Sequence, residues 1–362
     1  MKKNIAFLIY DDSLMGGAEK ISLQIASELT KYHNVHVFSI FNENKISHNK
    51  YSQDIVHHVL CEKTVSITKN LIRLSRLLRS KLVKSKIDVL FCITAGVNGL
   101  GIIATRGLKI KTVYCEHSNL KNQTYGKKHY IRQKYGAMYM NYVVTLTEKD
   151  KENFIKEFNL DRNKVTVIYN WFDIPEDFID VPYNIKSKTL ITAGRLAKVK
   201  GYDMLIEVAK IVFYKYPDWK WDIYGDGEMY DEIHEKIISL GLENNIILKG
   251  KSNNMINDYK NHAMYVLTSR YEGLPLSLLE AKVNHLPIVS FDCDTGPNEI
   301  VRDEVDGFLV ESCNTKEMVE KIESLISNSE IRKKMSDLSC ENLNKFKKDI
   351  IINQWLKLVD SL

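Results

Sequence analysis

The chain has 362 residues, more than one hydrophobic core usually serves, which favours two domains. Hydrophobic residues make up 44% and charged residues 27%, as in ordinary globular proteins, and no apolar run approaches the roughly 20 residues of a membrane-spanning helix. The formal net charge of +5 conceals an asymmetry, because residues 1–170 contain 27 Lys and Arg against 14 Asp and Glu, whereas the remainder contains 24 against 32.

The start of the chain and its cysteines indicate a cytoplasmic protein. The segment "MKKNIAFLIYDD" predicts a first β-strand and not a secretory signal, since its apolar run is short and acids follow it. Six cysteines are scattered without a C-x-x-C pair, which favours reduced thiols over a disulfide framework or a structural zinc site.

The first half of the chain alternates strand and helix patterns. A turn with Gly16 and Gly17 joins the first strand to a helix over residues 18–32, which is apolar at helical spacing. Continuous apolar, β-branched runs are typical of strands buried on both faces of a parallel sheet. The strands that we predict cover residues 4–10, 34–40, 88–94, 111–117 and 141–147.

A second alternating series follows a stretch without periodicity. We expect a domain over residues 1–172, a linker over 173–187, a second domain over 188–347, and a helix over 348–362 that completes the first domain through Trp355 and Leu356. The second series predicts strands at 189–196, 219–225, 245–250, 264–269, 286–292 and 307–310, and helices at 202–216, 229–241 and 275–284. The fold class is therefore α/β, with two Rossmann-like domains facing a central cleft.

Two acids flank the start of the helix predicted at 275–284. Glu272 precedes the turn with Gly273 and Pro275, and Glu280 lies inside the helix, in the segment "YEGLPLSLLEA". This segment follows a strand, so it belongs to the sheet edge where open α/β sheets bind ligands, and a helix start offers N–H groups to an anion. Glu280 has the chemistry to accept hydrogen bonds from two neighbouring ribose hydroxyls. The alternative is two acids with structural roles only.

A basic loop follows the first strand of the second domain. Arg195 and Lys200 in "GRLAKVKG" suit a diphosphate, which the guanidinium can hold by paired hydrogen bonds and the ammonium as a point charge. Lys198 is expected to face solvent. A merely basic surface loop is the alternative, and Gly225 and Gly227 in "YGDGEM" indicate a turn more than a binding site.

Several motifs together resemble the retaining glycosyltransferases of family 4, which have the GT-B fold. They are "GGAEKISLQIASEL", "EHSN", "GRLAKVKG", "YGDGEM", the pair Glu272 and Glu280, and "GPNEIVRDEVDGFLV". The resemblance covers most of the chain. It implies that Glu272 contacts the donor sugar and Glu280 the nucleotide ribose, while Arg195 and Lys200 hold the diphosphate.

The resemblance implies further contacts with the donor. Gly16 and Gly17 approach its phosphate, and His117 touches the sugar near the reacting carbon; Glu116 is expected to orient the loop that carries His117. The turn into the helix completes the donor site with Gly273, Leu274, Pro275 and Leu276. We therefore assign Glu272, His117, Arg195 and Lys200 to catalysis.

We expect neither a cofactor nor a metal ion. Arg195, Lys200 and the helix start can stabilise the charge of the leaving diphosphate without a cation. The sequence Asp292–Cys293–Asp294 spells D-x-D, the metal motif of another glycosyltransferase fold, but it precedes "TGPNEI", where the GT-B pattern has a sugar-side loop that Glu299 is expected to brace.

The basic first domain suits an acceptor on a polyprenyl diphosphate, since GT-B enzymes receive the acceptor there. The segment 69–86 contains seven Lys or Arg and no acid, with leucines at helical spacing. It predicts either a surface helix that packs its leucines on the sheet or a helix that docks on an anionic membrane, peripheral to the inner face of the plasma membrane. Basic residues at 121–134 form a second tract, and no recognition module indicates nucleic acid.

The function that we expect is retaining, metal-independent transfer of a hexose or N-acetylhexosamine from a UDP-linked donor. The acceptor is a glycan on a lipid diphosphate in bacterial capsule or O-antigen synthesis. A nucleotide-sugar epimerase and a non-catalytic nucleotide-binding partner subunit are the alternatives. Net transfer to an acceptor separates the transferase from the epimerase. The intact set of Arg195, Lys200, Glu272, Glu280 and His117 speaks against the partner subunit. An NAD oxidoreductase is not indicated, because no G-x-G-x-x-G follows either first strand.

Overall fold

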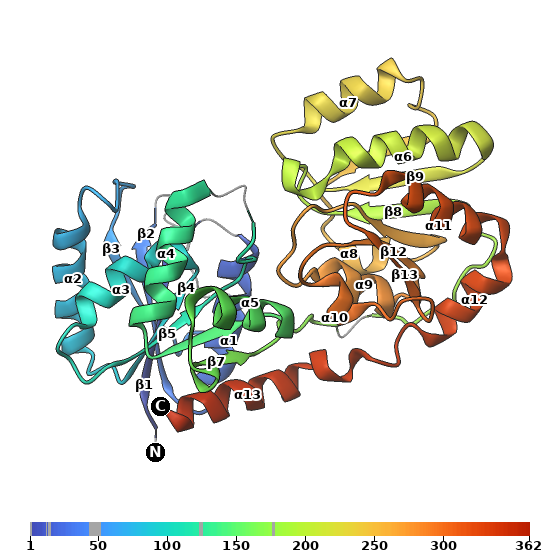
Figure 1. Cartoon of the computed structure of the whole chain (residues 1–362). Coiled ribbons are helices and arrows are strands. Elements are labelled where there is room, and N and C mark those ends of the chain that lie inside the picture. The colour runs from blue at the N-terminus through green and yellow to red at the C-terminus, as the bar shows by residue number, and fades with distance from the viewer. Residues whose placement is uncertain (1, 12, 14–15, 43–51, 123–125, 176–177) are drawn as a thin grey trace. The chain divides into compact units, whose positions relative to one another are not determined.

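The computed structural model describes residues 2–11, 13, 16–42, 52–122, 126–175 and 178–362. It divides into two compact units, of which unit 1 comprises the residues up to Asn170 together with Asp349–Leu362, and unit 2 comprises Trp171–Lys348. Each unit contains one parallel β-sheet with helices, as Figure 1 shows, which confirms the predicted α/β class with two Rossmann-like domains.

Unit 1 is built on seven parallel strands in the order β3-β2-β1-β4-β5-β6-β7. The strands are β1 (Asn4–Asp11), β2 (Asn34–Phe41), β3 (Val56–Cys61), β4 (Val89–Ile93), β5 (Lys111–Cys115), β6 (Tyr142–Thr145) and β7 (Val165–Val167). The helices are α1 (Gly17–Leu29), α2 (Leu71–Lys84), α3 (Asn98–Thr105), α4 (Gly126–Tyr139), α5 (Glu148–Phe158) and α13 (Lys348–Ser361), with 3-10 turns at Ala95–Val97 and Arg162–Lys164. β3 and β7 are edge strands that the sequence did not predict.

Helix α2 packs three of its leucines, as one of the two interpretations of residues 69–86 required, whereas Leu77 is exposed. Leu74, Leu78 and Leu82 recur every four residues, so they share one helix face, and all three are fully buried. The opposite face leaves Ile72 and Val83 exposed among the basic residues. Packing on the sheet is thus confirmed for this helix, whereas contact with a membrane stays a prediction.

Helix α13, the last of the chain, packs on unit 1. The ring of Trp355 lies edge-on to that of Phe91 in β4, with centroids 5.5 Å apart. The ammonium of Lys3 donates to the carbonyl of Val359 at 2.6 Å. Trp355 is buried, whereas Leu356 is only partly buried.

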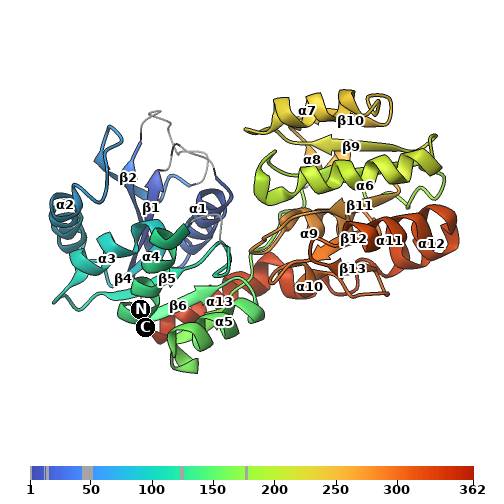
Figure 2. The ribbon, with the colours of Figure 1, turned by 45° about the horizontal axis from the view of Figure 1, so that its top comes forward.

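Unit 2 has six parallel strands in the order β10-β9-β8-β11-β12-β13. They are β8 (Thr189–Ala193), β9 (Lys220–Tyr224), β10 (Ile246–Gly250), β11 (Met264–Leu267), β12 (Ile288–Asp292) and β13 (Gly307–Glu311). The helices are α6 (Tyr202–Lys215), α7 (Tyr230–Ser239), α8 (Met255–Asp258), α9 (Leu276–Val283), α10 (Pro297–Ile300), α11 (Thr315–Ser327) and α12 (Ser329–Leu338), with 3-10 turns at Lys198–Lys200 and Leu343–Phe346. Figure 2 shows α6 and α11 side by side along this sheet.

The segment expected as a linker is attached to unit 2 where the structure describes it. Tyr183 donates through its hydroxyl to the carbonyl of Ala263 at 2.6 Å, and Ser187 does the same to Asn261 at 2.6 Å. Unit 2 begins at Trp171, well before β8, and these bonds attach the end of the segment to it.

Candidate active site

Both sheets reverse their strand order at one point, which is the place where open α/β sheets bind ligands. In unit 2, the chain runs outward from β8 to β9 and β10, and then returns to continue from β11 on the other side. The loops that leave β8 and β11 at their carboxyl ends therefore diverge, and ligands of open α/β sheets bind in the crevice between such loops. The β8 loop contains Arg195 and Lys200, and the β11 loop contains Glu272. The predicted donor residues of unit 2 thus meet at one switch point.

An ion pair joins the two loops. The ammonium of Lys200 lies 2.7 Å from Oε1 of Glu272, and the hydroxyl of Ser269 donates to the same oxygen at 2.6 Å. The side chain of Glu272 is 9% exposed and that of Lys200 is 28% exposed. The pair is therefore largely shielded from water, which strengthens the attraction compared with an ion pair on an open surface.

Three glycines allow the loops to approach this closely. Gly201 has φ of +70°, and a Cβ there would lie 2.0 Å from the carbonyl oxygen of Thr268 at the end of β11. A Cβ at Gly225 or Gly227 would lie 1.9 Å or 2.4 Å from carbonyl oxygens of the β8 loop. The "YGDGEM" turn therefore supports the Arg195 loop from behind, which agrees with its interpretation as a structural turn.

The side chain of Arg195 is exposed. It has neither a hydrogen-bond nor an ion-pair partner within the described parts of the chain, in contrast to Lys200. Lys198, also exposed, is its solvent-facing neighbour as predicted. A guanidinium that the protein itself does not pair can take a bidentate anion from solution.

The start of α9 differs by one residue from the prediction. The helix begins at Leu276, so Pro275, with φ of −74° and ψ of +98°, is the N-cap residue and not the first helical residue. Its extended ψ explains the difference, because an N-cap residue has not yet entered the helical conformation. Gly273 and Leu274 form the turn before it, and the helix N–H groups behind Pro275 lie at the same switch point as Lys200.

A neighbouring loop braces this turn. Thr295 donates through its hydroxyl to the backbone carbonyl of Glu272 at 2.6 Å. Gly296, with φ of +101°, lies so close that a Cβ there would be 2.7 Å from the carbonyl oxygen of Gly273. Glu299, expected to brace this loop, lies 3.7 Å from Lys345 in an ion pair.

Glu280 is held by one tyrosine from a different element. The hydroxyl of Tyr259 donates to Oε2 of Glu280 at 3.0 Å. Burial, and then the charge of Glu280, raise the pKa of Tyr259 well above its usual value, so this hydroxyl remains a donor at any physiological pH. Glu280 is partly exposed, and it lies one helical turn beyond the start of α9.

Unit 1 has its own switch point, between β1 and β4. The β1 loop leads to Gly16, the N-cap residue of α1, and to Gly17, the first residue of that helix; both are exposed. Across the switch point, Thr94 leaves β4 with φ of +66° and ψ of +161°. A positive φ is strained for a β-branched residue and is often found at functional sites. No pattern in the sequence indicated Thr94.

His117 follows β5 beside a buried acid. Glu116 is 1% exposed and accepts hydrogen bonds from the hydroxyls of Tyr114 and Ser118, from the Ser118 N–H at 2.8 Å, and from the Gln133 amide at 2.9 Å. Burial alone would raise the pKa of Glu116, but these bonds outweigh it and hold the pKa below its usual value. The ionised Glu116 therefore fixes the loop, as expected.

The imidazole of His117 is neutral at physiological pH. Burial lowers its pKa to about 4, against a smaller opposing effect of Glu116. Its Nδ1 atom is buried and has no hydrogen-bond partner among the described residues. An unpaired buried nitrogen is uncommon and often marks a place that a ligand completes.

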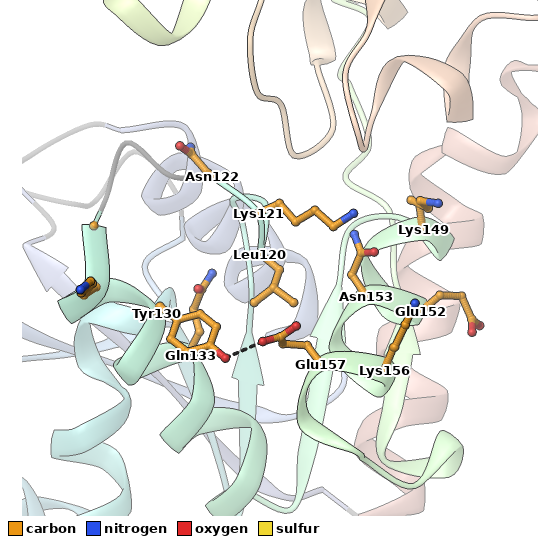
Figure 3. Close-up of a pocket in the computed structure, with 12 residues that line it drawn as sticks. Leu120, Lys121, Asn122, Tyr130, Gln133, Lys149, Glu152, Asn153, Lys156 and Glu157 are labelled. Atoms are coloured by element: carbon orange, nitrogen blue, oxygen red, sulfur yellow. Dashed lines mark hydrogen bonds between the residues drawn. The ribbon is translucent and has the colours of Figure 1, made fainter. Parts of the chain in front are cut away.

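A pocket opens at the carboxyl ends of β5 and β6 in unit 1. It encloses about 830 Å³ between the loop at Leu120, helix α4 and helix α5 (Figure 3). Four lysines line it, together with two glutamates, Glu152 and Glu157, of which the latter accepts from the Tyr130 hydroxyl at 2.5 Å. The lysines are Lys121, Lys127, Lys149 and Lys156. Lys121 and Lys127 belong to the basic tract at 121–134 that the sequence analysis identified. Lys149 and Lys156 in α5 were not identified, because acidic residues stand between them in the sequence.

The side chains of the D-x-D sequence differ in exposure. Asp292 is exposed at the end of β12 and Asp294 is half-buried, while Cys293 between them is buried. In the described part of the chain, no group of three or more His, Cys, Asp or Glu side chains could hold a metal ion.

Comparisons with known proteins agree with this architecture. Residues 173–339 match the family model described as glycosyl transferases group 1, and residues 15–175 match that of glycosyltransferase family 4. The amylovoran biosynthesis glycosyltransferase AmsD of Erwinia amylovora is 30% identical over 253 residues, 68% of this chain and 70% of AmsD. In Campylobacter jejuni, the GalNAc-alpha-(1->4)-GalNAc-alpha-(1->3)-diNAcBac-PP-undecaprenol alpha-1,4-N-acetyl-D-galactosaminyltransferase is 26% identical over 360 residues, 95% of each chain.

Among solved structures, Anabaena Alr3699/HepE in complex with UDP and glucose matches with a TM-score of 0.82 at 20% identity, over 99% of both chains. At this level of identity the match shows the fold. The first model covers all strands of the second sheet, and the other covers the strands of the first sheet from β2 to β7. The chain therefore belongs to the glycosyltransferases of group 1 and family 4, and its fold is GT-B.

Proposed function

We propose that this glycosyltransferase moves a hexose or N-acetylhexosamine from a UDP-linked donor to a glycan acceptor on a lipid diphosphate. The transfer retains the anomeric configuration, needs no metal ion, and serves the synthesis of a bacterial surface polysaccharide. One observation carries the proposal: Arg195, the Lys200–Glu272 pair, the start of α9 and Glu280 converge at one switch point. The UDP bound in Alr3699/HepE and the undecaprenol diphosphate in the Campylobacter enzyme's name support the donor and acceptor classes.

The donor diphosphate is assigned to the cationic residues at this switch point. Breaking the bond between sugar and diphosphate leaves negative charge on the departing phosphate, which Arg195, Lys200 and the first N–H groups of α9 stabilise. Lys200 has three N–H donors, so it can keep its contact with Glu272 at 2.7 Å while it binds a phosphate oxygen. These fixed charges take the role that a divalent cation has in other transferases.

The donor's sugar and ribose are assigned to carboxylates and to the neutral histidine. Glu272, already oriented by Lys200, accepts from sugar hydroxyls, and Glu280 accepts from the ribose. In unit 1 we assign the unpaired Nδ1 of His117 to a sugar hydroxyl. A neutral imidazole suits this task, because it can donate and accept without adding charge near the reacting carbon.

The acceptor is assigned to the lysine-lined pocket of unit 1. Lys149 and Lys156 from α5 and Lys127 from α4 all line it, and Figure 3 labels the two lysines of α5. Ammonium groups around a cavity of about 830 Å³ suit an acceptor that carries phosphate. Glu152 and Glu157 offer acceptors for glycan hydroxyls.

A lipid-linked acceptor implies work at the inner face of the plasma membrane. No helix in the described residues is long and apolar enough to cross a membrane. The outer face of α2 combines exposed Ile72 and Val83 with Arg73 and Arg76, which suits peripheral docking on anionic headgroups. We expect Arg73→Glu with Arg76→Glu to abolish binding to vesicles of phosphatidylglycerol, whereas Lys236→Glu on α7 leaves it unchanged.

The test is transfer from a panel of UDP-, GDP- and ADP-sugars to a synthetic polyprenyl-diphosphate glycan, with EDTA present. Transfer of an α-linked sugar from an α-configured UDP-sugar supports the whole proposal, and loss of transfer in EDTA overturns metal independence. A changed sugar that stays on the nucleotide would instead identify an epimerase. Binding of UDP without either reaction would identify the partner subunit.

A further inference from the structure

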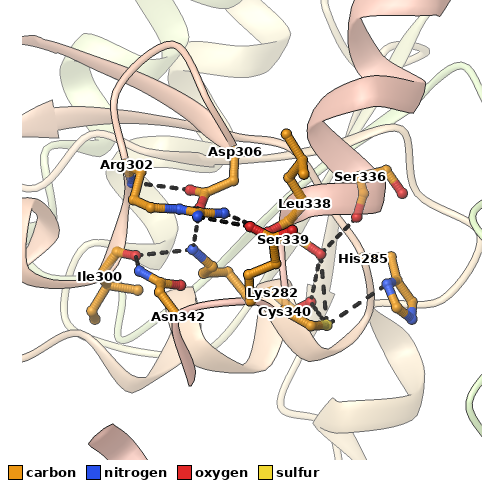
Figure 4. Close-up of polar contacts among 11 residues, drawn as sticks. Lys282, His285, Ile300, Arg302, Asp306, Ser336, Leu338, Ser339, Cys340 and Asn342 are labelled. Carbon is orange, nitrogen blue, oxygen red and sulfur yellow. Dashed lines mark hydrogen bonds and ion pairs between the residues drawn. The ribbon is translucent and has the colours of Figure 1, made fainter. Parts of the chain in front are cut away.

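One exposed cysteine stands in a hydrogen-bonded chain with a histidine and an aspartate. Sγ of Cys340, just after α12, lies 3.7 Å from Nδ1 of His285, which follows α9. The other ring nitrogen of His285 lies 2.8 Å from Oδ1 of Asp180. Figure 4 shows the ring of His285 beside the sulfur. All three residues belong to unit 2, and Cys340 is exposed to solvent.

The histidine brings positive charge to the sulfur. Its contact with Cys340, and then that with Asp180, raise the pKa of His285 to about 9 against the opposing effect of burial. The ring is therefore an imidazolium at neutral pH, and Asp180 fixes which nitrogen faces the sulfur. A cation in contact with a sulfur stabilises the negative charge that the sulfur carries when it attacks an electrophile.

The remaining charges around the sulfur are already paired with one another. Lys282 donates to Asp306 at 2.8 Å and to the carbonyl of Ile300 at 2.9 Å, and both side chains of the ion pair are fully buried. Arg302 lies 2.9 Å from Glu341, next to Cys340 in the chain. His285 is therefore the cation that Cys340 contacts directly.

We propose that Cys340 is a site of reversible S-thiolation by low-molecular-weight disulfides, with His285 and Asp180 as its activating residues. The Cys340 sulfur attacks one sulfur of the disulfide R–S–S–R, so a Cys340–S–S–R bond forms and the other R–S group departs as a thiolate, which takes up the proton that Cys340 has lost. Cys340 is oxidised and the departing thiol is reduced, so the exchange balances. A second exchange with a free thiol restores Cys340.

The surroundings can accept the added group without loss of the fold. The Cys340 thiol donates to the carbonyl of Lys282 at 3.1 Å, and a mixed disulfide removes that donor. The hydroxyl of Ser339 donates to the same carbonyl at 3.1 Å and remains after modification. The end of α9 therefore keeps a hydrogen-bond partner in both states.

The test compares two cysteines in one molecule. The full chain is incubated with oxidised glutathione at pH 7.5, and peptide mass spectrometry follows glutathionylation of Cys340 and of Cys313, the other exposed cysteine. We expect Cys340 to react at least about tenfold faster. His285→Asn should remove most of this difference, and Asn suits the left-handed backbone at position 285, where φ is +59°.

A milder variant separates activation from damage to the fold. Asp180 is 70% exposed, so Asp180→Asn is not expected to alter stability, yet it should slow the reaction of Cys340 about threefold. Equal rates for Cys340 and Cys313 in the wild type would overturn the proposal. So would an unchanged Cys340 rate in both the His285 and the Asp180 variants.

Discussion

The role of Glu280 can be tested by removing its charge while keeping its shape. Hydrogen bonds to a charged acceptor contribute about 1.5–3 kcal/mol, and those to a neutral acceptor about 0.5–1.5 kcal/mol. Glu280→Gln therefore weakens each of two ribose contacts by about 1 kcal/mol, or about 2 kcal/mol in all, which corresponds to an about 30-fold rise in the Kd for UDP. UDP without a sugar is the appropriate ligand, because it isolates the nucleotide contacts.

Isothermal titration calorimetry of UDP at one fixed salt concentration measures this effect. Tyr259→Phe is the matched control, since it removes the hydroxyl that lies 3.0 Å from Glu280 and leaves the carboxylate in place. We expect it to change the Kd by less than about threefold, because the ribose contacts remain. If Glu280→Gln binds UDP within threefold of the wild type, or if both variants lose affinity equally, Glu280 does not contact the ribose.

Substitutions at Arg195, Glu116 and His117 test the remaining assignments. Arg195→Ala should lower kcat/KM for transfer by about 100-fold or more, and Arg195→Lys should restore little of this loss. Lys198→Ala should change kcat/KM by less than about threefold. Glu116→Gln should lower the free energy of unfolding at pH 7 by about 1–3 kcal/mol, measured by urea unfolding. Hydrogen bonds hold the pKa of Glu116 below its usual value, so the stabilisation by Glu116 is present above that usual value and is lost as pH falls through the lowered pKa. The stability of the variant should therefore be less sensitive to acid. His117→Asn should lower kcat and leave the Kd for UDP unchanged. Because the pKa of His117 is about 4, its contribution to stability is present above about pH 6.5 and is lost as pH falls towards 4. The activity of the wild type should therefore show no inflection near about pH 6.5 from this residue.

The strands of the two sheets were mostly predictable from the sequence, because buried parallel strands are continuous apolar runs. Two edge strands were not. β3 reads "VHHVLC", in which paired histidines interrupt the apolar pattern, and β7 has three residues, too few for any periodicity. The register of β3 against β2 is fixed by pairing between two strands, and the local pattern of one strand does not contain that information.

The sequence nominated candidate site residues, but it did not indicate their contacts with one another. Arg195, Lys200, Glu272 and Glu280 could be identified because each follows a strand in a familiar spacing. The ion pair between Lys200 and Glu272 joins residues 72 positions apart, and it depends on Gly201, whose backbone φ of +70° lets two loops touch. The pocket between α4 and α5 was not predicted, because a loop and two helices from separate parts of the sequence supply its lysines, and acids in α5 conceal two of them.

The return of α13 to unit 1 determines the order in which the protein can finish folding on the ribosome. All of unit 2 is synthesised between Asn170 and Asp349, before the helix that covers Phe91 of unit 1 exists. Unit 2 can therefore complete its core during translation, while the apolar surface that Trp355 will cover stays open to water. We therefore expect a chaperone to bind nascent unit 1 at this exposed apolar surface. A chain truncated before residue 349 would keep the surface exposed permanently.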